Sequence, residues 1–234
     1  MIWLGIETAN APLSVAIVRD GKVVAEAVQH IKLTHSVGAM PAIEEVMNKA
    51  GITPADIDAI AVSEGPGSYT GVRIGVTLAK TLAWSLQKPL VGVSSLQVLA
   101  ANARTANHVV CALFDARRQN VYAGAYEGVT QEKVIEDYHD HIDGLLTKLD
   151  ALNRPVLFVG TDVEIYFEKI QSVLQERAIR VPFTLDLPRA SELIALAQTK
   201  ELPTVEAVHT FVPQYRRMAE AEANWIKEQK KEQQ

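Results

Sequence analysis

The sequence has a single cysteine in 234 residues, so no disulfide can form within the chain. That residue, Cys111, lies in the apolar run VVCALF, a setting typical of a buried, inert thiol rather than a nucleophile. A disulfide framework is therefore excluded. The cysteine usage favours a reducing compartment, and we expect the cytoplasm.

Long hydrophobic runs are also missing. No stretch approaches the roughly 18 uninterrupted apolar residues of a membrane-spanning helix. The first residues, MIWLGIETA, lack the basic segment and the long apolar segment of an export signal. We therefore expect no membrane association.

An excess of positive charge is a third absence. The chain has 23 basic and 28 acidic residues, for a formal net charge of -5, and the two signs are interspersed. This balance argues against a protein that grips nucleic acid mainly by its own charge, because such binding needs clustered lysine and arginine. The 48% of hydrophobic residues is enough to build a substantial core.

The order of apolar segments predicts the fold. Apolar, β-branched stretches indicate strands, Asp20-Gly21 is a hairpin signal, and helices alternate with strands further on. The expected elements of the first half are strands at 2–9, 13–20 and 22–31, a helix at 37–50, a strand at 59–63, a helix at 71–87 and a strand at 89–94.

The second half repeats this order without repeating the sequence. We expect strands at 108–116, 120–128, 155–160 and 179–185, and helices at 164–176 and 190–200. The pattern predicts an α/β fold of duplicated ribonuclease-H-like units, with mixed sheets flanked by helices, as in the actin and sugar-kinase (ASKHA) superfamily. The expected units are 1–104, a degenerate 105–212, and a C-terminal helix at 213–234 that can pack back on the first unit and frays at its end.

A glycine-rich loop, SEGPGSYTGVRIG at residues 63–75, separates an expected strand from an expected helix. Gly65, Gly67 and Gly71 could present amide groups to an anion at the start of that helix. The loop could equally be a tight turn capped by Ser68 or Thr70. No lysine follows in the manner of a P-loop, and spacing alone leaves both interpretations open.

The helix beyond this loop has more apolar surface than one side of a sheet requires. Its apolar residues span an arc of roughly 200°, about twice the width needed, and the preceding helix shows the same excess. This surplus could pack on the neighbouring helix, on the second unit or on another protein.

Residues 63–100 resemble the TsaB (YeaZ) family of bacterial tRNA threonylcarbamoyladenosine proteins. The resemblance continues in IETANAPLSVAI, in FDARRQNVYAGAY and in FVPQYRRMAEAE, so it covers nearly the whole chain. It implies a non-catalytic scaffold and activator that forms a heterodimer with TsaD. TsaD transfers a threonylcarbamoyl group to the adenosine 3' of the anticodon in tRNAs that read codons beginning with A.

The same resemblance implies further partners. TsaE completes the larger complex, the chain alone forms a homodimer, and tRNA is engaged mainly through the complex. The surplus apolar surface would then pack against the equivalent helices of TsaD. The candidate interface residues are Met40, Ile43, Met47, Gly71, Ile74, Gly75, Leu78 and Leu82.

The histidine content argues against a metal site. TsaD-like proteins have two histidines, four residues apart, where this sequence has Ser95 and Leu99, which cannot replace them. His139 and His141 are close together in DYHDHID, where a solvated loop is expected. A peptidase reading has no two-histidine site to support it, and no metal is predicted.

The acidic residues are more compatible with a nucleotide site than the histidines are with a metal site. Glu7 ends the first strand, Asp115 holds the comparable place in the second unit, and 159–162 weakly resembles a second phosphate loop. Capping or turn roles are favoured for each. We expect no cofactor to be required, with room for ATP or ADP at a vestigial or interface site lined by Glu7, Gly65, Gly67, Ser68 and Asp115. The alternative is an independent actin-like ATPase or kinase that uses Glu7 and the loop at 65–71.

Overall fold

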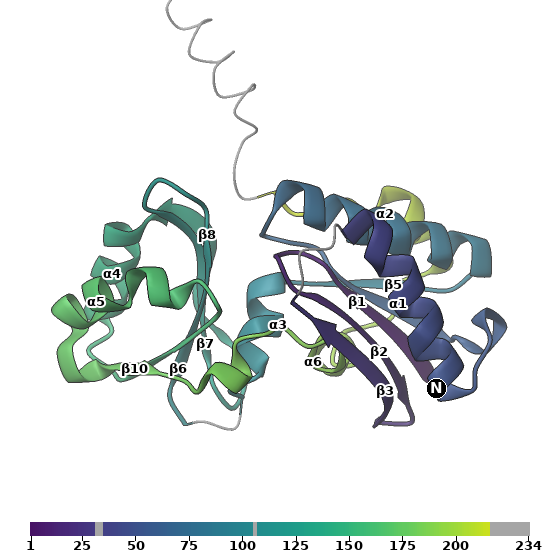
Figure 1. The fold of residues 1–234 in the computed structure, drawn as a ribbon, viewed down its shortest axis with the longest axis horizontal. Coiled ribbons are helices and arrows are strands. Elements are labelled where there is room, and N and C mark those ends of the chain that lie inside the picture. The colour runs from purple at the N-terminus through teal and green to yellow at the C-terminus, as the bar shows by residue number, and fades with distance from the viewer. Residues whose placement is uncertain (31–34, 105–106, 216–234) are drawn as a thin grey trace, which may run out of the picture.

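The computed structural model describes residues 1–30, 35–104 and 107–215, which form two mixed five-stranded sheets (Figure 1). The first sheet has the order β3-β2-β1-β4-β5. Its strands are β1 (Ile2–Glu7), β2 (Leu13–Arg19), β3 (Lys22–Gln29), β4 (Ala59–Ser63) and β5 (Leu90–Val93). β2 pairs antiparallel with β1 and β3, whereas β4 pairs parallel with β1 and β5.

The second sheet repeats this topology strand for strand, in the order β8-β7-β6-β9-β10. β7 is antiparallel to β6 and β8, and β9 is parallel to β6 and β10. The strands are β6 (Val109–Asp115), β7 (Asn120–Glu127), β8 (Lys133–His141), β9 (Val156–Val159) and β10 (Ala178–Arg180). The predicted pair of ribonuclease-H-like units is confirmed.

Helices cover the outer face of each sheet and fill the space between the sheets (Figure 1). The first sheet is covered by α1 (His35–Ala50) and α2 (Tyr69–Leu86), and the second by α4 (Ile142–Ala151) and α5 (Val163–Leu174). Between the sheets lie α3 (Ser95–Ala101) and α6 (Ala190–Ala197). None of the helices that the structure describes is long and apolar enough to cross a membrane.

The two central helices cross over between the units. Leu96 and Leu99 of α3 pack with Val110 and Phe114 of the second sheet. Leu193 and Ile194 of α6 pack with Trp3 and Ala16 of the first sheet. Each unit therefore buries a helix that the other unit's chain supplies, and residues of the predicted 105–212 unit complete the core of the first.

Two local predictions need correction. The solvated loop expected around His139 and His141 is wrong, because both belong to β8, where they pair with Tyr122 and Asn120 of β7. β8 is an edge strand, which tolerates polar side chains. The strand expected at 179–185 ends at Arg180, and Pro182 precedes a short 3-10 helix, Phe183–Leu185.

Short 3-10 helices also occur at Pro54–Asp56, Gln175–Arg177 and Val205–Thr210. The last of these begins a strap that lies along α2 and β5. Lys80 of α2 donates to the carbonyl oxygen of Phe211 at 2.7 Å, and the amide of Gln214 donates to that of Glu64 at 2.7 Å. Most of the C-terminal helix predicted at 213–234 lies outside the described residues.

Candidate functional site

Glu7 is buried at the carboxyl end of β1, with an exposed fraction of 0%. Its Oε1 accepts the amide hydrogen of Ala9 at 2.7 Å, while Oε2 has no partner among the described residues. Burial raises the pKa of Glu7 to about 7, although the Ala9 amide and the Ser63 hydroxyl act in the opposite direction. Burial thus keeps this carboxyl group protonated to a higher pH than an exposed glutamate.

The glycine loop that follows β4 is packed against its own chain. A Cβ atom at Gly67 would lie 2.2 Å from the carbonyl oxygen of Ala9, and one at Gly65 would lie 2.6 Å from that of Gln214. The amide of Gly65 donates to Ser95 Oγ at 3.1 Å. The amide of Ser68 donates to the Ala9 oxygen at 2.7 Å. These contacts explain why glycine is needed without invoking a ligand.

The first turn of α2 is capped as one of the sequence alternatives anticipated. Ser68 Oγ accepts the amide hydrogen of Gly71 at 3.4 Å. Thr8 Oγ1 donates to the Gly71 oxygen at 2.8 Å, and a Cβ at Gly75 would lie 2.2 Å from that hydroxyl. Gly71 and Gly75 thus let α2 approach the turn between β1 and β2 closely.

Asp115, at the end of β6, is the topological counterpart of Glu7 and is engaged inside the second unit. Its Oδ1 accepts hydrogen bonds from the Tyr166 hydroxyl at 2.6 Å and from the amide of Arg117 at 3.0 Å. Its own amide donates to Asp162 Oδ2 at 2.8 Å. Asn10 Nδ2, from the first unit, reaches the same Asp162 oxygen at 3.4 Å. Asp115 and Asp162 therefore bond to each other within the second unit, and Asn10, which was not among the predicted site residues, links Asp162 to the first unit.

The segment 159–162 holds a carboxylate in place of an external anion. The amide of Gly160, whose φ is 130°, donates to Asp186 Oδ1 at 3.0 Å. Asp186 is buried and also forms an ion pair with Arg180, whose Nη1 lies 2.8 Å from Oδ1. An internal aspartate thus uses the donor that a phosphate loop would offer.

The positions discussed for metal ligands serve the core. Ser95 and Leu99 are both fully buried, and Ser95 Oγ is bonded to the Gly65 amide. Across residues 1–30, 35–104 and 107–215, no group of three or more histidine, cysteine or acidic side chains could hold a metal ion. Cys111 is buried as predicted, and burial raises the pKa of its thiol to about 12.

One polar network had no counterpart in the sequence analysis. Asp137 of β8 accepts hydrogen bonds from the Tyr126 hydroxyl through Oδ1 and from Ser94 Oγ through Oδ2. Ser94 precedes α3 in the first unit, so the network ties the two units together at the root of that helix. Burial raises the pKa of Tyr126, and the charge of Asp137 adds to the effect. No local motif in the sequence links these three residues, since Ser94 is 32 residues from Tyr126 and 43 from Asp137.

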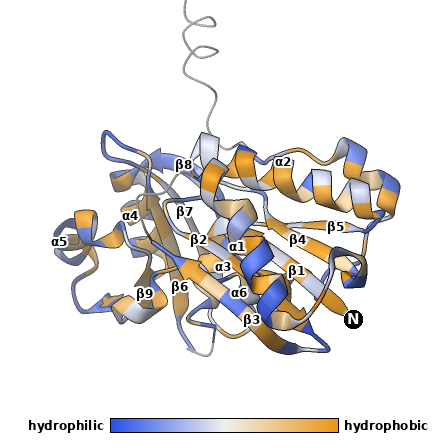
Figure 2. Cartoon of the chain, turned by 45° about the vertical axis from the view of Figure 1, so that its right-hand side comes forward, coloured by the Kyte–Doolittle hydropathy of each residue, from blue (hydrophilic) through white to orange (hydrophobic). Residues whose placement is uncertain are grey.

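The outer face of α1 and α2 carries exposed apolar side chains, and apolar residues run along α2 in Figure 2. Val37, Met40 and Trp84 are exposed, and Ile74, Leu78 and Leu82 are partly exposed. The other four predicted interface residues lie beneath this surface, where they build the core of the first unit: Ile43, Met47, Gly71 and Gly75. They can support a contact surface but cannot form it.

Comparisons with known proteins identify the family. Residues 22–225 match the family model TsaD, tRNA N6-adenosine threonylcarbamoyltransferase. The tRNA threonylcarbamoyladenosine biosynthesis protein TsaB of Bacillus subtilis (strain 168) is 44% identical over 232 residues, which are 98% of this chain and 100% of the relative.

Solved structures agree with this assignment. A Pseudomonas aeruginosa protein described as similar to the peptidase YeaZ has 28% sequence identity and a TM-score of 0.77, covering 92% of this chain and 99% of its own. An activator of 2-hydroxyisocaproyl-CoA dehydratase from Clostridium difficile, 11% identical with a TM-score of 0.51, covers 90% of this chain and 96% of its own and shares the fold alone. With the full-length relative at 44% identity, the chain belongs to the TsaB family of tRNA threonylcarbamoyladenosine biosynthesis proteins.

Proposed function

We propose that this chain is a non-catalytic subunit that binds and activates a TsaD-type transferase during threonylcarbamoyladenosine synthesis. Membership of the TsaB family indicates that the chain takes part in tRNA threonylcarbamoyladenosine biosynthesis. The partner surface is the exposed strip on α1 and α2, formed by Val37, Met40, Ile74, Leu78 and Leu82, which we name the α1–α2 strip.

The single observation that carries the proposal is this set of exposed and half-buried apolar side chains on two helices that pack against each other. A surface helix normally turns its apolar residues inward, and contiguous exposed apolar surface marks an interaction site. A specific complex buries about 1,600 Å² in total, an area that two such helices and a matching pair can supply. The transferase TsaD is the favoured partner, and a second copy of this chain uses the same strip when TsaD is absent.

The burial and the hydrogen bonds of the candidate carboxylates support a non-catalytic role. Glu7 is enclosed, and Asp115 and Asp162 accept hydrogen bonds from their own chain. An independent ATPase, the alternative function, would need these carboxylates to face metal and phosphate. We therefore propose that the chain requires no cofactor, and that any ATP or ADP binds at a vestigial site or at the interface with TsaD.

The test is reconstitution of threonylcarbamoyl transfer to tRNA with TsaD, TsaE and the enzyme that supplies the activated group. We expect transfer to fall at least tenfold when this chain is omitted and to return when it is added back. A Glu7→Ala variant that restores transfer as well as the unchanged chain would support the non-catalytic role. Transfer that proceeds equally well without the chain would refute activation, and ATP hydrolysis by the chain alone that Glu7→Ala abolishes would favour the alternative.

A further inference from the structure

We propose that this chain contacts RNA directly, through a surface that combines Tyr69, Arg73, Tyr215, Arg117 and Arg118. We name it the arginine–tyrosine surface. The proposal rests on the proposed function, since it concerns the same tRNA, but it assigns a contact to this chain and not only to its partner. It lies beside the α1–α2 strip, at the end where α2 begins.

Three exposed side chains stack at the start of α2. Tyr69 is 54% exposed and Tyr215 is 48% exposed, and their ring centroids are 5.2 Å apart. Arg73 Nη1 donates to the Tyr69 hydroxyl at 2.7 Å, and the guanidinium carbon lies 5.1 Å from the Tyr69 ring centre. No acidic side chain in the described part of the chain forms a salt bridge with Arg73. Stacked tyrosines beside a guanidinium group that pairs with no described carboxylate suit unpaired bases and phosphates.

The turn between β6 and β7 holds two more arginines in an uncommon backbone conformation. Arg117, Arg118 and Gln119 have φ angles of 66°, 52° and 63°, and none of them is glycine. Asn120 Nδ2 holds the turn by donating to the carbonyl oxygens of Arg117 at 3.2 Å and Arg118 at 3.1 Å. Both arginines are exposed. Three consecutive left-handed residues are costly, and such strain is typically kept where it positions a functional group.

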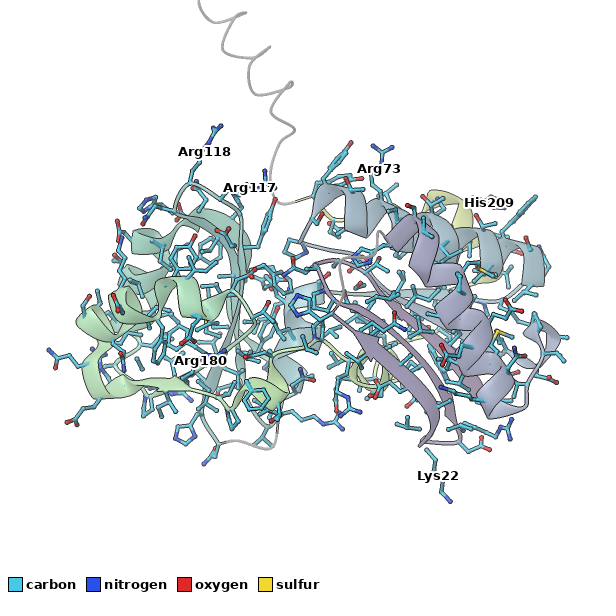
Figure 3. All side chains as sticks on the ribbon, in the orientation of Figure 1. Lys22, Arg73, Arg117, Arg118, Arg180 and His209 are labelled. Atoms are coloured by element: carbon cyan, nitrogen blue, oxygen red, sulfur yellow. The ribbon has the colours of Figure 1, made fainter. Side chains whose placement is uncertain are left out.

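The two clusters border the same edge of the molecule. Arg73, Arg117 and Arg118 all point toward the upper edge in Figure 3. A series of hydrogen bonds connects the segments that carry the two clusters. The amide of Ser68 donates to the carbonyl oxygen of the residue before Asn10. Asp162 then accepts hydrogen bonds from the side chain of Asn10 and from the amide of Asp115. Asp115 in turn accepts the Arg117 amide. The start of α2 and the β6–β7 turn are thus linked through a series of hydrogen bonds, and one ligand can contact both.

The chemistry of this edge fits RNA better than a protein partner. The chain is acidic overall, with a formal net charge of -5, yet this edge gathers three guanidinium groups and two exposed aromatic rings. Phosphate groups complement the charge, and unpaired bases, as in an anticodon loop, complement the rings. The ligand is therefore the loop of a folded RNA rather than a uniform duplex.

The test measures binding of unmodified tRNA to the heterodimer with TsaD, and to the isolated chain in parallel, at several salt concentrations. The variants are Arg73→Gln and Arg117→Gln. Lys22→Gln removes the same charge at the opposite edge and is the matched control (Figure 3). We expect each arginine variant to weaken binding about three- to tenfold and to reduce the slope of log K against log salt by roughly 0.7 to 0.9, as loss of one phosphate contact requires. The control should leave both unchanged.

Tyr215→Ala provides a charge-neutral arm. Loss of a stacked base should weaken binding roughly five- to a hundredfold with little change in the salt slope. Arginine variants that bind tRNA with the affinity and slope of Lys22→Gln would overturn the surface, as would an Arg73→Gln variant that fails to assemble with TsaD in the absence of RNA. Failure of the unchanged chain to assemble with TsaD would instead reject the proposed function, and the RNA surface would still be judged on the isolated chain.

Discussion

The two units share one topology, but the outer helices of the two units differ in their ion pairs and in their exposed apolar residues. In the second unit an ion pair joins the two helices, because Lys169 Nζ of α5 lies 2.6 Å from Asp143 Oδ1 of α4. In the first unit the ion pair Lys49–Glu45 stays within α1, and no described ion pair joins α1 to α2. The first unit instead leaves Val37 and Met40 of α1 exposed.

Exposure of single apolar residues does not by itself distinguish the two layers. Ile165 of α5 is 64% exposed, as is Val37 of α1. The difference is in their surroundings. An ion pair links α4 to α5 in the layer that carries Ile165, whereas no described ion pair links α1 to α2 beneath their exposed apolar residues. In a duplicated fold, the helical layer of one unit can therefore remain solvent-exposed while the corresponding layer of the other unit binds a partner protein.

The largest expected effect comes from placing a charge on the α1–α2 strip. We expect Met40→Glu and Leu78→Glu each to weaken the heterodimer with TsaD by about 100-fold or more, because a carboxylate would be buried without a partner. Ile165→Glu, on the corresponding layer of the second unit, is the matched control and should bind normally. Sedimentation or titration calorimetry measures the affinity. Circular dichroism checks that each variant is folded. If the folded Met40→Glu and Leu78→Glu variants bind TsaD as tightly as Ile165→Glu does, the first unit's helical layer is not the partner surface.

The second prediction compares the two strand ends: Oε2 of Glu7 has no hydrogen-bond partner among the described residues, whereas Asp115 accepts a hydrogen bond from the Tyr166 hydroxyl at 2.6 Å. The pKa of Glu7 is raised to about 7 from 4.5, so its folded form holds a proton more tightly than the unfolded chain does. Its contribution to stability is thus fully present below about pH 4.5 and is lost as the pH rises to about 7, a change of about 3 kcal/mol.

Glu7→Gln should remove this loss. Urea unfolding between pH 4.5 and 8 should show a decline in the free energy of unfolding for the unchanged chain that is flatter for the variant. A constant offset from the new amide does not affect this comparison, since only the pH dependence is used. An identical decline in both proteins would mean that Glu7 is not the group that titrates.

The sequence was sufficient for the strands of the first sheet, but it missed β8 and did not reveal the contacts between distant segments. Apolar, β-branched runs and the Asp20-Gly21 turn identified the strands of the first sheet, and Glu7 was placed at its strand end. The exchange of α3 and α6 between the units was not predictable in the same way. It depends on which sheet Leu96 and Leu193 reach, and chain order alone assigns each helix to the unit that precedes it.

The functional face was predicted in outline only. The wide apolar arcs of the two helices indicated surplus surface, but helical periodicity does not separate residues that pack on the sheet from residues that remain outside. Ile43 and Met47 are buried in the core of the first unit, whereas Met40 is exposed. The glycines of the loop were similarly ambiguous. Glycine is needed wherever the backbone comes close to another group, whether that group is a bound anion or a backbone oxygen of the same chain.

A smaller effect is expected where α2 packs on the turn after β1. Gly75→Ala should destabilise the fold by about 1–3 kcal/mol, because the new methyl group would meet Thr8 Oγ1 at 2.2 Å. Thr8→Ala removes that hydroxyl and its bond to Gly71, so the double variant should be more stable than the sum of the single changes predicts. Chemical denaturation of the four proteins measures the coupling, and strictly additive effects would argue against this contact.

The smallest expected effect concerns the ion pair that closes the second unit. Lys169 and Asp143 are exposed side chains, with 38% and 61% of their surfaces accessible, so solvent screens their attraction. The Lys169 contact holds the pKa of Asp143 below its usual range, so this contribution exists above that range and is lost as the pH falls through the lowered value. Lys169→Met should lower Tm by roughly a degree or two at neutral pH and low salt, with no effect at high salt. Because the layer also contains the exposed Ile165, a Lys169→Met variant that begins to self-associate in sedimentation would show that the charge, rather than the packing beneath it, keeps this layer from becoming an interface like that of the first unit.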